Sequence, residues 1–159
     1  MFGVPLLWGQ AVAKSNIVDP IDETRGEHCK SFWEHLIARH PLEANYSKPT
    51  KLAYRWREIS ELRLVVAQYI SFAGNQVGVF IRGERSVAPA AVHSRLKPFA
   101  NGLQKALRRE LFSDTKYFFH KDKEFQTEGT AKWDEMADWL HKNANAYQDA
   151  LRRIMRGVA

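Results

Sequence analysis

The sequence predicts an α+β domain in which helices cover a mainly antiparallel sheet. Apolar residues recur at helical spacing near both ends of the chain, which indicates a helix at each end. Between them lie segments rich in β-branched and aromatic residues, with a Gly-Asn turn signal in the middle. The chain has 159 residues and is 45% hydrophobic, so it has the size of one domain and can bury a core.

The first helix is predicted over residues 23–40, where Cys29, Phe32, Trp33 and Leu36 form an apolar stripe before Pro41 ends it. The apolar residues 1–21 are predicted to be a separate connector containing a short docking strand. Residues 22–159 are then expected to form the single α+β domain.

Three strands in a meander are predicted next, from the segments LAYRWREI, LRLVVAQYIS and QVGVFIRG, with a tight turn at FAGNQ. Residues 52–59 fit a helical period as well as a strand period. We favour a strand because Tyr and Trp prefer strands and a third strand completes the meander. Alternation in this strand is interpreted as placing Tyr54 and Trp56 in the core and Arg55 and Arg57 on the opposite, accessible face.

The second half of the chain predicts two more helices and one or two short strands. Residues 87–112 carry an apolar stripe that Pro98 should kink or break near Lys97. KYFFH is expected to be a short strand, after which KDKE could turn into a second one, FQTE. A long helix over residues 131–156, with Thr130 as its N-cap, is expected to pack on the sheet.

Charge and cysteine content restrict the partners and the compartment. The chain has 24 Lys and Arg against 18 Asp and Glu, a formal charge of +6, which favours anionic partners such as nucleic acid. Cys29 is the only cysteine, so no disulfide can form within the chain, and a reducing, cytoplasmic location is expected. No apolar run is long enough for a membrane span, and no membrane partner is expected.

Several segments, in order, resemble the DUF4268 family, a bacterial and archaeal domain family of unknown function. They are FWEHL, the Trp56 strand with LRLVVAQYISFAGNQVGVFIRG, then LKPFANGLQKALRREL and KWDEMADWLHKNANAYQDAL. The resemblance spans residues 28–155. Because these are packing motifs, they point to a fold rather than to a chemistry.

The resemblance also implies a context. In longer family proteins a restriction-endonuclease-like domain comes first, and residues 1–21 resemble the connector that follows it. We therefore expect a short or truncated form that has the accessory domain without the nuclease-like core. A nuclease-like partner or self-association would fit that context.

No motif in the chain specifies catalysis. It contains neither the Glu-x-Lys that a nuclease core needs nor a His-Glu-x-x-His metal motif, and its serines lack a nucleophile-elbow context. We favour a non-catalytic domain over an enzyme and expect neither a metal nor a cofactor.

Two functions are therefore expected for the domain. The first is binding of nucleic acid, DNA in particular, through a basic surface around the strands, made of Lys51, Arg55, Arg57, Arg63, Arg82 and Arg85. The alternative is a protein-interaction or oligomerisation module that uses the apolar residues Phe2, Val4, Leu7 and Trp8.

Overall fold

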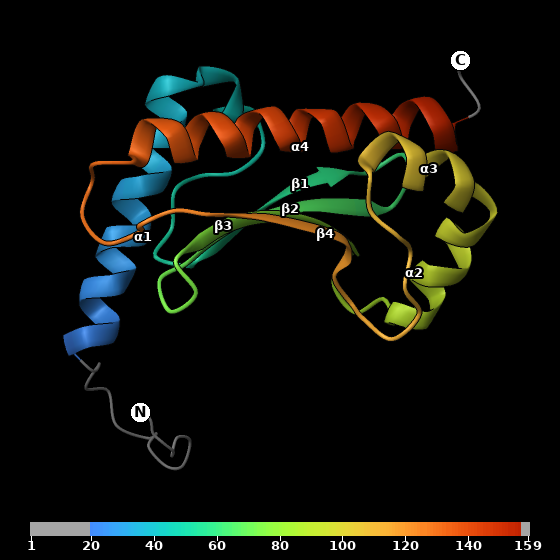
Figure 1. Cartoon of the computed structure of the whole chain (residues 1–159), viewed down its shortest axis with the longest axis horizontal. Coiled ribbons are helices and arrows are strands. Elements are labelled where there is room, and N and C mark those ends of the chain that lie inside the picture. The colour runs from blue at the N-terminus through green and yellow to red at the C-terminus, as the bar shows by residue number, and fades with distance from the viewer. Residues whose placement is uncertain (1–19, 157–159) are drawn as a thin grey trace, which may run out of the picture.

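The computed structural model describes residues 20–156 and confirms the α+β class, with a four-stranded antiparallel sheet and a long C-terminal helix packed on it (Figure 1). In chain order the elements are α1 (Pro20–Arg39), η2 (Pro41–Asn45), β1 (Tyr54–Ile59), β2 (Leu64–Ser71), β3 (Gln76–Gly83), α2 (Pro89–Leu96), η3 (Lys97–Phe99), α3 (Ala100–Leu107), β4 (Phe118–Glu124) and α4 (Trp133–Met155).

The sheet has the simplest order, β1-β2-β3-β4, and every neighbouring pair is antiparallel. The three-stranded meander is thus confirmed, and residues 54–59 are strand. Asn75 adopts a positive φ of 49° in the turn between β2 and β3, a conformation that asparagine tolerates better than most residues. The segment containing α2 and α3 connects β3 to β4, and β4 pairs with the free edge of β3.

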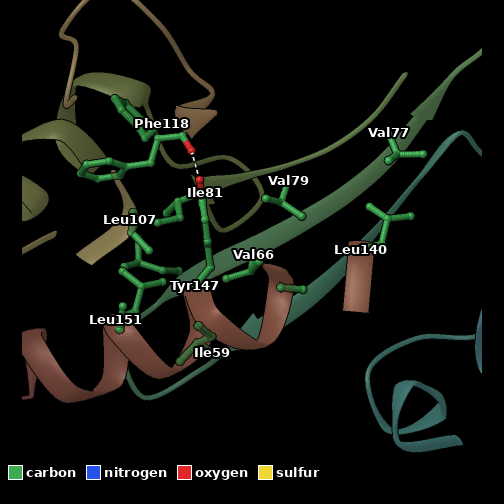
Figure 2. Close-up of a cluster of buried hydrophobic side chains, with 14 of the residues drawn as sticks. Ile59, Val66, Val77, Val79, Ile81, Leu107, Phe118, Leu140, Tyr147 and Leu151 are labelled. Atoms are coloured by element: carbon green, nitrogen blue, oxygen red, sulfur yellow. Dashed lines mark hydrogen bonds between the residues drawn. The ribbon is translucent and has the colours of Figure 1, made fainter. Parts of the chain in front are cut away.

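Helix α4 lies along one face of the sheet and contacts β2 and β3, while α1 and α3 pack against α4 (Figure 1). The core lies between these layers. In Figure 2, Val66, Val79 and Ile81 of the sheet face Leu140, Tyr147 and Leu151 of α4. Cys29 and Trp33 of α1 belong to the same buried cluster, as the apolar stripe of the first helix predicts.

The predicted break near Lys97 is confirmed, because α2 ends at Leu96 and a short 3-10 turn containing Pro98 separates it from α3. Two expectations about the later elements are wrong. KDKE does not turn, because it continues β4 to Glu124, and FQTE forms no strand. Helix α4 begins at Trp133 with Lys132 at the N-cap and no side-chain cap, so Thr130 does not have that role.

A β-bulge interrupts the pairing of β3 with β4. Val79 pairs with Lys121 and Ile81 with Phe118, so two residues of β4 lie opposite Phe80. Phe119, the extra residue, has a positive φ of 55° and is buried, as is Phe118. The bulge therefore directs two consecutive phenylalanines into the core and leaves His120 on the other face of the sheet.

The two faces of β1 are the reverse of the prediction. Arg55 and Arg57 lie on the face covered by α4 and are only 4% and 1% exposed, whereas Tyr54 is 45% exposed and Trp56 is half-buried on the opposite face. The reason is a buried acid, Glu43 of η2, which pairs with both guanidinium groups.

Candidate functional site

We call the side of the sheet away from α4 the open face. It carries Tyr54 and Trp56 of β1, Tyr69 of β2, Phe80 and Arg82 of β3, and His120 of β4. Within the described part of the chain, no helix lies over its central strands (Figure 1). These six side chains, together with Tyr117, line a hollow of about 490 Å³.

The register of the strands explains why the face is hollowed. Trp56 pairs with Ala67, and Ala67 pairs with Phe80, so two large rings lie on either side of a single methyl group. In the next row Tyr54 pairs with Tyr69, which pairs with Gly78. The small side chain of Ala67 thus leaves space between the rings of Trp56 and Phe80.

Gly78 is required by the position of Tyr69. A Cβ atom at residue 78 would lie only 2.5 Å from the Cζ and hydroxyl oxygen of Tyr69, well inside van der Waals contact. The absence of a side chain at Gly78 therefore allows the Tyr69 ring to lie across the neighbouring strand. The ring also stacks on His120, with a centroid separation of 5.6 Å and an interplanar angle of 22°.

Hydrogen bonds fix the same ring at its polar end. The Tyr69 hydroxyl and His120 Nε2 lie 2.5 Å apart and share a hydrogen bond, and Gln76 Nε2 donates to the same hydroxyl at 2.8 Å. Burial raises the pKa of Tyr69, so the phenol stays protonated at neutral pH. Burial lowers the pKa of His120, against the opposing effect of Asp122, which favours a neutral imidazole.

Two arginines lie against the indole ring of Trp56. The guanidinium carbon of Arg82 is 4.3 Å from the ring centroid and that of Arg85 is 5.4 Å away, which is the geometry of cation–π contacts. Neither arginine forms an ion pair within the described residues. Arg82 lines the hollow, whereas Arg85 lies on the Trp56 ring in a smaller neighbouring hollow that Glu58 and Glu84 also line.

The other predicted basic residues do not join this group. Arg55 and Arg57 are buried on the covered face, which excludes them from a phosphate contact in this fold. Arg63 lies in the β1–β2 turn and pairs with Glu84 at 3.3 Å. Lys51 pairs with Glu27 of α1 at 2.9 Å. Of the six candidates, only Arg82 lines the hollow, and Arg85 joins it at the Trp56 ring.

Glu43 organises a buried polar network on the covered face. Its carboxylate accepts from Arg55 Nη1 at 2.6 Å and Arg57 Nη2 at 2.5 Å, and it lies 2.8 Å from His141 Nδ1. Gln68 and Asn145 provide further partners for the guanidinium groups. Burial raises the pKa of Glu43, but the charge of Arg57 and the other contacts outweigh it, and the net pKa is lowered. This network joins η2, β1 and α4, and the Glu43 side chain at its centre is fully buried.

Sequence reasoning missed the face of β1 although one signal was present. Ile59 has the same parity as Arg55 and Arg57, and Glu58 has the parity of Trp56. An aliphatic residue prefers the core more strongly than a glutamate does, so the end of the strand identifies the covered face. The aromatic residues Tyr69, Phe80, Tyr117 and His120 were missed as site residues because their convergence depends on register.

The remaining predictions concern the apolar N-terminal residues, metal binding and membrane spans. Phe2, Val4, Leu7 and Trp8 lie outside the described residues. The connector predicted over residues 1–21 also lies outside them, except for Pro20 and Ile21, which begin α1. Across residues 20–156 no group of three or more His, Cys, Asp or Glu side chains could hold a metal ion. Over the same range, no helix is long and apolar enough to cross a membrane.

No family model, no curated protein and no solved structure matches this chain. The resemblance to the DUF4268 family and the context that it implies therefore stay predictions. The chemistry of the open face has to be argued from its own residues.

Proposed function

We propose that this domain is a non-catalytic nucleic-acid-binding module and that its binding surface is the open face of the sheet. The observation that carries the proposal is the pair of guanidinium groups, Arg82 and Arg85, that lie against Trp56 beside an aromatic hollow and form no ion pair within the described residues. Guanidinium groups bind phosphate oxygens, and aromatic rings stack on bases, so one surface offers partners for both parts of a nucleotide.

The net charge of the chain supports the same proposal. The excess of six positive charges favours approach of a polyanion, and the opposite face of the sheet is not available for it because α4 covers it. Glu58 opposes binding, since it is exposed on the open face in the row that contains Arg82 and lines a smaller hollow with Arg85. Replacing Glu58 by Gln should therefore strengthen binding.

The experiment is fluorescence anisotropy of labelled single-stranded and duplex oligonucleotides, titrated with protein at several salt concentrations. Binding should weaken with salt, because each phosphate contact adds about 0.7 (single strand) to 0.9 (duplex) to the slope of log K against log salt. The double variant Arg82→Ala with Arg85→Ala should lose about two contacts from that slope. Absence of binding to every oligonucleotide at low salt would overturn the proposal.

Arg153→Ala is the matched control. Arg153 is an exposed arginine of α4 and forms no ion pair within the described residues, but α4 lies on the other side of the sheet. Arg153→Ala lowers the net charge by one, as Arg82→Ala alone does, and it should leave the salt slope unchanged. An equal loss from Arg153→Ala would indicate a diffuse charge effect and would contradict a site on the open face.

A further inference from the structure

The hollow on the open face is lined mainly by aromatic rings, in addition to groups that can form hydrogen bonds. Tyr54 and Tyr117, at its two sides, are each 45% exposed, and Tyr69 and Phe80 lie half-buried between them. We infer that the nucleic acid bound here is single-stranded and that at least one unpaired base enters the hollow to stack on these rings. This inference rests on the proposed function and adds the class of ligand.

The shape of the site favours an unpaired base over a duplex. In a duplex each base is covered on both faces by its neighbours, and a protein reaches only base edges and the sugar-phosphate backbone. The rings around the hollow therefore find no exposed base face to stack on in a duplex. A volume of about 490 Å³ lies within the range of roughly 300–1,000 Å³ typical of small-molecule pockets. Sheets with aromatic side chains on an open face are also an established arrangement for stacking unpaired bases.

The stacking surface is held in place before any ligand binds. Gly78 allows the Tyr69 ring to lie across β3, and the contacts with His120 and Gln76 hold its hydroxyl. Phe80 lies edge-on to Tyr117 at 4.7 Å between centroids, so the rings also support one another. A fixed platform loses little conformational entropy on binding, which favours affinity for a planar ligand.

The charges around the hollow select an anion. Arg82 and Arg85 border the Trp56 side, and the Lys116 ammonium lies 5.5 Å from the Tyr117 ring on the other. These cations disfavour a cationic ligand, which aromatic rings could otherwise accept. Asp122, paired with Gly78 in register, adds a negative charge toward the β2–β3 turn. We therefore expect phosphates to lie near the arginines and the bases to point into the hollow.

The deciding experiment compares oligonucleotides that differ only in their bases. A labelled 15-nucleotide single strand, an abasic strand of the same length and a blunt duplex would be titrated by anisotropy at one low salt concentration. The abasic strand keeps the phosphates and loses every stacking partner. The natural single strand should bind at least 10-fold more tightly than both others.

Protein variants provide the second arm. Tyr54→Ala and Tyr117→Ala remove exposed rings that the fold does not bury, so both variants should fold, which circular dichroism would check. Each should weaken single-strand binding roughly 5- to 150-fold, the range expected for loss of one base–aromatic stack. Phe112→Ala is the matched control, because Phe112 is an exposed ring that does not line the hollow, and it should bind as the native protein does. Gly78→Ala should displace the Tyr69 ring and weaken binding similarly.

The outcomes separate this inference from the proposed function. Equal affinity for the natural and abasic strands, with a loss only in the Arg82 and Arg85 variants, would overturn the stacking inference and leave nucleic-acid binding intact. Absence of binding to any oligonucleotide would overturn both. A dimer in sedimentation that Tyr117→Ala dissociates, together with no oligonucleotide binding, would assign the face to a second copy of the chain.

Discussion

Glu43 and Arg57 form an ion pair of 2.5 Å between two side chains that are 0% and 1% exposed. Glu43 also pairs with Arg55 and contacts His141, so one carboxylate of the short helix η2 joins β1 to α4. A buried ion pair gains little over a well-packed apolar pair, but removal of one partner leaves an uncompensated charge in the interior. Tyr54 and Trp56 can lie on the open face only because this network accommodates Arg55 and Arg57 on the covered face.

Replacement of Glu43 by Ala or Gln should therefore destabilise the fold strongly. Two buried guanidinium groups would lose their counter-charge, and we expect a loss of about 3–5 kcal/mol in the free energy of unfolding. Urea denaturation followed by circular dichroism measures it. Glu61→Gln, which breaks an exposed ion pair with Arg152, should have a much smaller effect. Equal losses for Glu43 and Glu61 would contradict a structural role for the network.

Charge reversal distinguishes the two faces of the sheet. Arg55→Glu combined with Arg57→Glu places three carboxylates together in the interior and should prevent folding, which a collapsed amide NMR spectrum would show. Arg82→Glu combined with Arg85→Glu changes the charge by the same amount on the open face and should leave the spectrum dispersed. A folded Arg55 and Arg57 variant would mean that these side chains are accessible after all.

The sequence predicted the element order well because periodicity and turn residues act locally. The stripe containing Phe32 and Leu36, the break at Pro98 and the strand at residues 54–59 all depend on near neighbours in the chain. The burial of Arg55 and Arg57 depends instead on a glutamate outside the sheet, and Ile59 is the one residue of β1 that indicates the covered face. No periodic pattern in the strand itself reveals that Glu43 will neutralise two arginines.

The candidate site was even less accessible to sequence reasoning. Charge alone predicts Arg82 and Arg85 as binding residues, and both lie against Trp56, which lines the hollow. The aromatic lining arises from register, from Gly78 and from the β4 bulge that leaves His120 on the open face. These are non-local consequences of pairing, and a bulge cannot be placed from the short segment KYFFH alone.

The hydroxyl of Tyr147 should contribute measurably to stability. Tyr147 extends from α4 into the core and donates to the Phe119 carbonyl at 2.5 Å, next to the β4 bulge (Figure 2). Tyr147→Phe would leave that buried carbonyl unpaired, which costs about 1–3 kcal/mol. Urea denaturation would measure the loss, and Tyr117→Phe, at an exposed ring, serves as the control. No difference between the two variants would show that water replaces the lost donor.

Cys29 should react slowly with thiol reagents in the native protein. Its side chain lies in the core at 3% exposure, and burial raises the pKa of the thiol, so both access and thiolate formation are unfavourable. Labelling with a chromogenic disulfide reagent should be slow in buffer and fast in concentrated urea. Rapid stoichiometric labelling of the folded chain would contradict the placement of α1 against the core.

The stability of the fold should decrease in acid partly through Glu43. Because the pKa of Glu43 is lower in the folded state than its ordinary value near 4.3, its contribution is complete above that value and is lost as pH falls through the folded pKa. The urea midpoints of the native protein and Glu43→Gln should therefore differ by a constant amount from pH 7 to about 5 and converge at lower pH.

A direct titration does not depend on the variant folding. Carbon-13 NMR of the side-chain carboxylates should show a pKa for Glu43 below the ordinary glutamate value. Asp138 provides an internal reference, because its hydrogen bonds from Arg39, aided by His40, lower its pKa to about 2 at a partly exposed site. A Glu43 pKa at or above the ordinary value would mean that burial outweighs the two arginines, and the ion pairs in the interior would then not be formed as described.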